Sequence, residues 1–205
     1  MQSQCLYDEG EEAWPLKLHL GAGSVFLKGY TNIDIRGVLA DDYPQAMLDN
    51  ETTIDNYYRG LEGTMKSLPH PRSTVVNSLA DIRQLPYGAR AVDKVVAIQV
   101  FEHLTPVEAI KTLDHWHALL KSGAPLVLSV PDMLGTMFLL ESDDEQERSF
   151  AVRHLRGSYK NEYARHYAWY TETTLTQLLE HCGFQVERLP NFHLYPSILL
   201  RGKSL

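Results

Sequence analysis

Residues 16–23 read Leu-Lys-Leu-His-Leu-Gly-Ala-Gly, and residues 31–35 read Thr-Asn-Ile-Asp-Ile. The first stretch is an extended apolar run that breaks into a glycine turn, and the second brings Asp34 to the end of the next strand. Glycine has no Cβ and tolerates positive φ, so a ligand can approach the main chain at Gly21 and Gly23. A carboxylate at the end of the neighbouring strand can accept hydrogen bonds from both hydroxyls of a ribose. Together the two stretches predict a nucleoside-type cofactor across the carboxyl ends of a parallel sheet.

Strand signals recur along the whole chain and alternate with helix signals. Several strand candidates, such as residues 95–98, are nearly continuous apolar runs, as expected for parallel strands covered on both faces. The alternation predicts the α/β class with a Rossmann-like, doubly wound sheet. The seven strand candidates are residues 16–20, 31–35, 73–80, 93–100, 124–130, 184–190 and 196–203.

Two helices have clear start and stop signals. One follows a capping box at residues 105–108 and stops near Gly123, and the other begins near Thr171 and stops at Gly183. Helical spacing predicts that the first helix buries one apolar stripe. The stripe consists of Val107, Ile110, Leu113, Trp116, Leu119 and Leu120.

Two segments are longer than a minimal version of this fold requires. We expect residues 15–205 to form a single domain, preceded by a flexible, acidic lead-in at residues 1–14. Residues 40–70 form an insert, helical between Pro44 and Met65, and residues 132–170 separate a strand from the last helix. Connections of this length in a compact domain are usually lids or binding segments, so we expect both inserts to cover the site.

Composition narrows the classes of partner and the compartment. The net charge of −7 and the pI near 5.7 argue against general binding to nucleic acids or to anionic membranes. Cys5 and Cys182 are far apart without metal-ligand spacing, which fits a reducing, cytoplasmic location. The polar, acidic start lacks the features of a signal peptide, and no apolar run approaches the roughly 18 residues of a membrane helix. A homodimer is compatible with this composition.

The glycine turn departs from the dinucleotide-binding fingerprint. Phe26 stands where the third glycine would be, so the close helix approach that cradles a pyrophosphate is missing. A cofactor without phosphates is therefore favoured. A nicotinamide-dependent dehydrogenase or epimerase is the weaker alternative, since the chain also lacks a Tyr-x-x-x-Lys pair. Glycine turns without any ligand, and strand-end aspartates that only cap a turn, are the structural alternatives.

Later strand ends carry further candidates. Asp81 follows the third strand and could accept a hydrogen bond from a purine amine while Ile82 packs on the ring, although an Asx turn explains Asp81 nearly as well. The fourth strand runs into Gln99, and Glu102 and His103 follow before the capped helix. These two residues could line the pocket or serve only as helix-entry residues.

The ordered set of motifs resembles the class I S-adenosylmethionine-dependent methyltransferases, in particular a small group with a short connection between the glycine turn and Asn-x-Asp. The resemblance spans about residues 16–203. It implies a mostly parallel, seven-stranded sheet whose last strand is antiparallel. The motifs that carry it are residues 18–23, Asn32 to Asp34, Asp81 to Pro86, Glu102 to Leu104, residues 120–124, Pro131-Asp132 and residues 170–184.

The resemblance also implies where S-adenosylmethionine binds. The turn at residues 20–23 would pass under its methionine and ribose parts, and Asp34 would hold the ribose hydroxyls. Asp81 would contact the adenine, and residues 99–101 would line the methionyl end. The complete implied set is Leu20, Gly21, Ala22, Gly23, Asp34, Ile35, Asp81, Ile82, Gln99, Val100 and Phe101.

The acceptor side is less determined. A sulfonium methyl group is already activated, so the protein mainly aligns an acceptor and excludes water, and a hydroxyl acceptor also needs a base. Residues 154–170 are rich in histidine, tyrosine and cations, which suits a small-molecule or glycan-like acceptor and O-methylation. We rank His166 first as base, then His154 and His103. An amine, thiol or carboxylate acceptor would need no base, and a lone histidine is more often structural.

Two further expectations concern metals and turnover. Asp132, His103 and the nearby histidines show no recognisable ligand spacing in the sequence, so we expect no metal. A non-catalytic accessory protein that binds S-adenosylmethionine is the alternative from another functional class, because the glycine turn and Asp34 indicate binding but not turnover.

Overall fold

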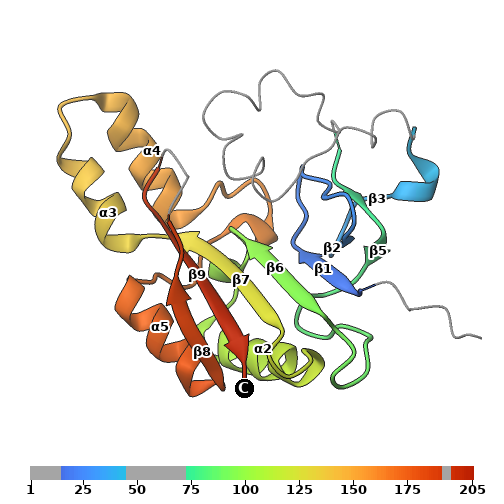
Figure 1. Ribbon diagram of the computed structural model, residues 1–205. Coiled ribbons are helices and arrows are strands. Elements are labelled where there is room, and N and C mark those ends of the chain that lie inside the picture. The colour runs from blue at the N-terminus through green and yellow to red at the C-terminus, as the bar shows by residue number, and fades with distance from the viewer. Residues whose placement is uncertain (1–14, 45–72, 191–194) are drawn as a thin grey trace, which may run out of the picture.

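The computed structural model describes residues 15–44, 73–190 and 195–205. Its main element is a seven-stranded sheet with the strand order β5-β2-β1-β6-β7-β9-β8 (Figure 1). Only β9 runs against its neighbours, since both β7 and β8 pair with it in antiparallel fashion. The predicted fold class is therefore confirmed. The strands are β1 (Lys17–Leu20), β2 (Thr31–Asp34), β5 (Ser78–Leu79), β6 (Lys94–Ile98), β7 (Pro125–Pro131), β8 (Phe184–Arg188) and β9 (Ser197–Ser204).

Two crossover helices, α2 (Pro106–Leu119) and α5 (Glu172–His181), pack on the same face of the sheet (Figure 1). The capping box before α2 is complete, with both Thr105 and Glu108 making their bonds, and Pro106 occupies the first turn. The predicted stripe is wrong at Val107 and Ile110, which are 63% and 40% exposed. The helix is rotated so that Ala109 and Thr112 join the other four stripe residues on its buried side, because these positions share one face at 3.6 residues per turn.

The first crossover, residues 24–30, contains turns and no helix. The buried side chain of Asn32 positions this crossover. Its Oδ1 accepts a hydrogen bond from the Leu27 amide at 2.8 Å, and its Nδ2 donates to the Leu27 and Tyr30 carbonyls. The same Oδ1 lies 2.9 Å from Nδ1 of the fully buried His19 on β1. One side chain thus ties the connection to both strands that flank it.

His19 leads to a prediction about acid stability. Burial lowers the pKa of His19 from 6.5 to about 4, the largest influence on this group. Between these pH values His19 is protonated in the unfolded chain but not in the folded chain. The free energy of unfolding therefore falls as the pH falls. We expect a loss of about 3 kcal/mol between pH 6.5 and pH 4 from this group. Urea unfolding across this range should show a smaller pH dependence for His19→Gln than for the wild type; equal slopes would contradict the assignment.

The third predicted strand, residues 73–80, is divided in two. Val75–Val76 (β4) pairs with Val38–Leu39 (β3) in a separate small sheet, and only Ser78–Leu79 (β5) reaches the edge of the main sheet. Asn77 lies at the division, where its amide donates to the Asn32 carbonyl and its Oδ1 accepts from the Asn32 amide. A short 3-10 helix, η1 (Ala40–Asp42), follows β3.

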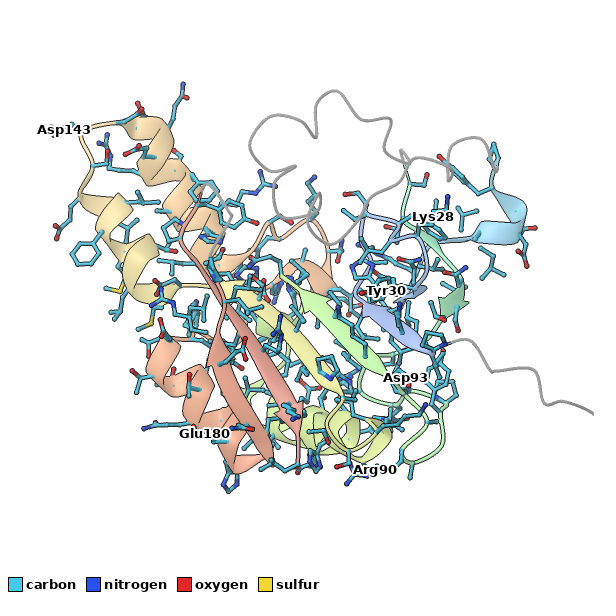
Figure 2. The ribbon with its side chains drawn as sticks, viewed as in Figure 1. Lys28, Tyr30, Arg90, Asp93, Asp143 and Glu180 are labelled. Atoms are coloured by element: carbon cyan, nitrogen blue, oxygen red, sulfur yellow. The ribbon has the colours of Figure 1, made fainter. Side chains whose placement is uncertain are left out.

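Residues 132–170 are mostly helical and not an irregular loop. They contain α3 (Met133–Phe138), η6 (Leu139–Glu141), α4 (Glu145–Arg156) and η7 (Glu162–Ala164). Gly157 ends α4 at a φ of 82°, a conformation that favours glycine. Figure 1 shows α3 and α4 extending beyond the end of β7, and Figure 2 shows Asp143 at their outer tip.

Three expectations fall on residues that the structure does not describe. The lead-in at residues 1–14 and the helix between Pro44 and Met65 lie outside the described residues, apart from Pro44 itself. The 40–70 insert is described only at residues 40–44, so its role as a cover stays a prediction. None of the described helices has both the length and the apolar character needed to cross a bilayer.

Candidate active site

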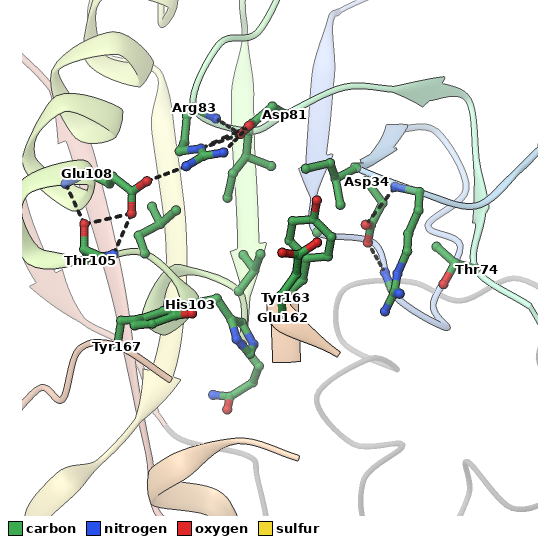
Figure 3. Close-up of a pocket in the computed structure, with 18 residues that line it drawn as sticks. Asp34, Thr74, Asp81, Arg83, His103, Thr105, Glu108, Glu162, Tyr163 and Tyr167 are labelled. Atoms are coloured by element: carbon green, nitrogen blue, oxygen red, sulfur yellow. Dashed lines mark hydrogen bonds and ion pairs between the residues drawn. The ribbon is translucent and has the colours of Figure 1, made fainter. Parts of the chain in front are cut away.

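A pocket of about 640 Å³ opens at the carboxyl ends of β1, β2 and β6 (Figure 3). This is the edge of the sheet at which the sequence predicted a ligand. The pocket combines main chain from the glycine turn, side chains from four connections after strands, and η7 from the 132–170 insert. Its lining residues are Gly21, Gly23, Asp34, Ile35, Arg36, Thr74, Asp81, Ile82, Arg83, Gln99, Val100, His103, Leu104, Thr105, Glu108, Glu162, Tyr163 and Tyr167.

The glycine turn exposes its main chain because both glycines adopt positive φ, 65° at Gly21 and 53° at Gly23. Between them, Ala22 is buried, and its amide donates to the Ile33 carbonyl on β2. Leu20 is also fully buried. Of the four predicted turn residues, the two glycines therefore face the pocket, while Leu20 and Ala22 hold the turn against the core.

The two glycines should respond differently to alanine. A Cβ on Gly21 would lie 2.3 Å from Cγ2 of Val100, whereas a Cβ on Gly23 would meet nothing closer than the Gly21 carbonyl oxygen at 3.9 Å. We expect Gly21→Ala to cost about 3 kcal/mol of stability through overlap and backbone strain, and Gly23→Ala only about 1 kcal/mol. Thermal unfolding measures both. Gly23→Ala should nevertheless weaken cofactor binding, because the added methyl group would enter the pocket that Gly23 lines. Equal losses of stability in the two variants would contradict the predicted difference.

Asp34 is the acid at the end of β2. Its Oδ2 accepts a hydrogen bond from the Gly23 amide at 3.0 Å, so the carboxylate also fixes the glycine turn. Its Oδ1 accepts a longer bond from the Arg36 amide at 3.4 Å. A carboxylate offers about four acceptor positions, so lone pairs remain for two ribose hydroxyls. Ile35 lines the pocket beside it.

Asp81 lines the pocket but is held by a neighbour (Figure 3). Arg83 donates to both carboxylate oxygens, from Nε to Oδ1 at 2.9 Å and from Nη2 to Oδ2 at 2.6 Å, and this contact lowers the pKa of Asp81. Arg83 also pairs with Glu108 of the capping box. The predicted contact with an adenine amine would compete with Arg83, and it stays a prediction. The buried Ile82 lines the pocket beside Asp81.

The connection after β6 contributes only part of the predicted set. Gln99 lines the pocket at an unusual φ of 53°, and its amide donates to the Ser129 carbonyl on β7. Val100 also lines the pocket. Phe101 does not, because its ring is fully buried against Trp116 and Tyr170, with centroids 5.9 Å and 5.7 Å away. Its place is in the core, which corrects the expectation that it lines the methionyl end.

The three candidate bases occupy different places. His103, ranked last, is the only one that lines the pocket among the described residues. Its Nδ1 lies 2.7 Å from the Arg165 carbonyl oxygen, which can only accept, so Nδ1 carries the proton and Nε2 keeps a lone pair. His166, ranked first, packs edge-on behind His103 at a centroid distance of 4.7 Å. His154 is buried in α4 near Thr136 and does not line the pocket.

Glu102 is buried next to His166. Its Oε1 lies 3.8 Å from Nε2 of His166. Burial raises the pKa of Glu102 and lowers the pKa of His166, so burial disfavours the charged form of both groups. Burial also lowers the pKa of His103. The backbone brings these residues together, because the Tyr167 and Ala168 amides both donate to the Glu102 carbonyl.

Sequence reasoning missed six pocket residues, namely Arg36, Thr74, Arg83, Leu104, Thr105 and Glu108. Glu108 was recognisable as a capping residue, but its second contact with Arg83 joins segments that are distant in the sequence. Tyr163 and Tyr167 lie in the segment expected to meet the acceptor. Figure 3 shows Glu162 and Tyr163 between Asp34 on one side and His103 on the other.

The pocket fits an adenosyl cofactor without phosphates. The open main chain at the glycine turn and the spare acceptor positions of Asp34 suit a ribose. The described connection at residues 24–30 offers no helix N-terminus, which is the usual device for binding a pyrophosphate. Gly21, Gly23 and Asp34 are therefore the residues that could hold S-adenosylmethionine.

Comparison with known proteins agrees with this geometry. A methyltransferase domain family matches residues 19–189. No curated protein sequence matches the chain significantly.

Similar solved structures include an S-adenosylmethionine-dependent methyltransferase from Methanosarcina mazei, at 18% identity, a TM-score of 0.51 and 92% coverage of both chains. A second, from Aquifex aeolicus, has 14% identity, a TM-score of 0.50 and coverages of 93% and 82%. A third, 1,6-didemethyltoxoflavin-N1-methyltransferase from Burkholderia thailandensis, has 17% identity, a TM-score of 0.50 and coverages of 93% and 71%. At these identities the likeness concerns the fold. With the family match over most of its length, the chain belongs to the methyltransferase domain family and is a class I S-adenosylmethionine-dependent methyltransferase.

Proposed function

We propose that this enzyme transfers the methyl group of S-adenosylmethionine to a hydroxyl oxygen of a small, polar acceptor. The observation that carries the proposal is the position of His103, which presents an unprotonated Nε2 in the pocket that also contains Asp34 and the glycine turn. The bound cofactor supplies an activated methyl group for in-line displacement. The chain then has to hold both reactants, exclude water and remove the hydroxyl proton.

The proposed cofactor contacts follow from the lining residues. Asp34 would accept hydrogen bonds from the ribose hydroxyls while its other positions keep the turn at Gly23 in place. Ile35 and Ile82 are the apolar side chains available to the adenine ring. Gln99 and Val100 also line the pocket, with Val100 close to Gly21, and would contact the methionyl part of the cofactor.

The acceptor end would be formed by residues of the 132–170 insert. Tyr163 and Tyr167 present amphipathic rings to the pocket, and Arg36 lies over the Tyr163 ring at 5.9 Å. In the same insert, Arg156 and Arg165 lie over the Tyr159 ring at 5.2 Å and 5.1 Å. Aromatic faces with polar tips and cations suit polyhydroxylated or glycan-like molecules, optionally with an anionic group. We infer that this insert serves as the cover of the site.

The size of the pocket also supports a small acceptor. Its volume of about 640 Å³ lies within the roughly 300–1,000 Å³ of small-molecule sites, and the cofactor uses part of it. We also propose a cytoplasmic location, because the two widely separated cysteines of the sequence fit a reducing compartment.

Methyl transfer to a panel of matched acceptors tests the proposal. S-adenosylmethionine with a ¹³C-labelled methyl group would be incubated with the enzyme and with hydroxyl compounds, each paired with its amine and thiol analogue. Mass spectrometry finds the product, and the ¹³C chemical shift identifies the methylated atom. We expect an O-methyl signal from a polyhydroxylated compound. A label found only on nitrogen, sulfur or carbon would overturn the assignment.

A further inference from the structure

Three potential metal ligands converge behind the acceptor end of the pocket. Glu102 and His103 come from η5 (Phe101–His103), and His166 comes from the segment after η7. One ligand atom from each residue lies within 4.8 Å of the ligand atoms of the other two. Local sequence patterns did not predict this group, because 62 residues separate His103 from Arg165, whose carbonyl holds His103 beside His166.

The geometry of the two histidines suits a cation. His103 donates from Nδ1 to the Arg165 carbonyl, so Nε2 keeps a lone pair. The Nε2 of His166 lies 3.8 Å from Oε1 of Glu102. Histidines that bind metals usually donate their other ring N–H to a carbonyl or carboxylate in this way, which fixes the ring and its tautomer.

Glu102 supplies an independent observation. The residue is only 1% exposed, and its Oε2 has no hydrogen-bond partner among the residues that the structure describes. A buried carboxylate oxygen without a partner is costly unless something satisfies it. A divalent cation would supply both the missing partner and the opposite charge.

We propose that Glu102, His103 and His166 bind a divalent transition metal ion, with Zn²⁺ as the best-suited ion. Two imidazoles and one carboxylate form the ligand set of three-ligand zinc sites that keep a position open for water or substrate. Imidazole ligands also disfavour Mg²⁺ and Ca²⁺, which prefer oxygen. Ligand atoms around a tetrahedral Zn²⁺ lie about 3.3 Å apart, so the three side chains would move together by only about 1 Å.

The position of His103 connects this ion with the reaction. His103 lines the pocket, so an open coordination position on its side would face the acceptor. An ion there would occupy the lone pair of His103, so His103 would act as a ligand and not as the base. A hydroxyl bound to the ion would have a lowered pKa and would release its proton to bulk water before methyl transfer. The role in turnover rests on the proposed O-methylation, whereas ion binding itself does not.

Competition with a chromophoric zinc chelator tests ion binding on the whole chain, without acceptor. We expect one Zn²⁺ per chain, and at least a hundredfold weaker binding in Glu102→Gln and in His166→Gln. His181→Gln, at the exposed end of α5, is the matched control and should bind Zn²⁺ like the wild type. Circular dichroism establishes that each variant is folded; if one is not, the other carries the test. Zn²⁺ binding that survives both ligand substitutions, or its absence from the wild type, would overturn the site.

Activity after chelation separates this inference from the proposed function. If chelated enzyme loses O-methylation and regains it with Zn²⁺, both stand. If Zn²⁺ binds at the three residues but no hydroxyl compound is methylated, the metal site stands and the proposed function fails. If chelated enzyme methylates hydroxyls at the full rate and binds no Zn²⁺, the metal site fails and His103 acts directly as the base.

Discussion

Asp34→Ala is expected to weaken the binding of S-adenosylhomocysteine, the demethylated cofactor, about a thousandfold. Each hydrogen bond from a ribose hydroxyl to this carboxylate is worth about 1.5–3 kcal/mol, and a thousandfold loss corresponds to about 4 kcal/mol for two of them. The substitution also releases the Gly23 amide, which Asp34 holds at 3.0 Å. Isothermal titration calorimetry measures the affinity directly.

Two variants control this experiment. Asp34→Asn keeps an oxygen that can accept from the Gly23 amide and should lose less affinity than the alanine variant. Asp143→Ala removes the same charge at the outer tip of the α3–α4 unit, away from the pocket, and should bind like the wild type (Figure 2). If Asp34→Ala binds S-adenosylhomocysteine with an affinity within about threefold of the wild type, the ribose does not bind to this carboxylate.

His103→Gln is expected to lower the rate of methyl transfer about a thousandfold while S-adenosylhomocysteine affinity stays within about threefold. Loss of a positioned proton acceptor typically costs 10²–10⁴-fold. Glutamine retains a polar group of similar length, but its amide nitrogen cannot accept a proton. Single-turnover rates with a saturating acceptor, together with calorimetry, separate the chemical step from binding.

The controls for His103 distinguish the pocket from the histidines near it. His181→Gln should leave the rate unchanged, since it lies at the exposed end of α5. His154→Gln should act mainly on stability, because His154 is buried in α4 and does not line the pocket. A His103→Gln enzyme that turns over at the wild-type rate would show that the hydroxyl is activated elsewhere, or that the acceptor needs no activation.

Local sequence signals predicted the sheet and the meeting of the glycine turn with Asp34. The glycine turn and Asp34 are adjacent in space because β1 and β2 are adjacent and parallel, and that pairing follows from the apolar pattern. The same signals could not divide the third strand at Asn77, because its partner β3 is only two residues long. The predicted stripe of α2 failed at Val107 and Ile110 because hydrophobicity alone does not decide which side a helix buries.

The acceptor end depended on contacts that no local pattern contains. Sequence alone ranked His166 above His103, yet packing places His103 against the pocket and His166 behind it. The pair between Arg83 and Glu108 and the grouping of Glu102 with both histidines join segments tens of residues apart. A homodimer and a glycan-like acceptor stay predictions.

A crystal structure of the enzyme with S-adenosylhomocysteine would locate the cofactor. We predict the adenosyl group in the pocket at the carboxyl ends of β1 and β2, with both ribose hydroxyls within about 3 Å of the Asp34 carboxylate and the main chain of Gly21 to Gly23 beneath it. A ligand bound elsewhere, or in this pocket with its ribose turned away from Asp34, would show that Asp34 and the glycine turn do not form the cofactor site.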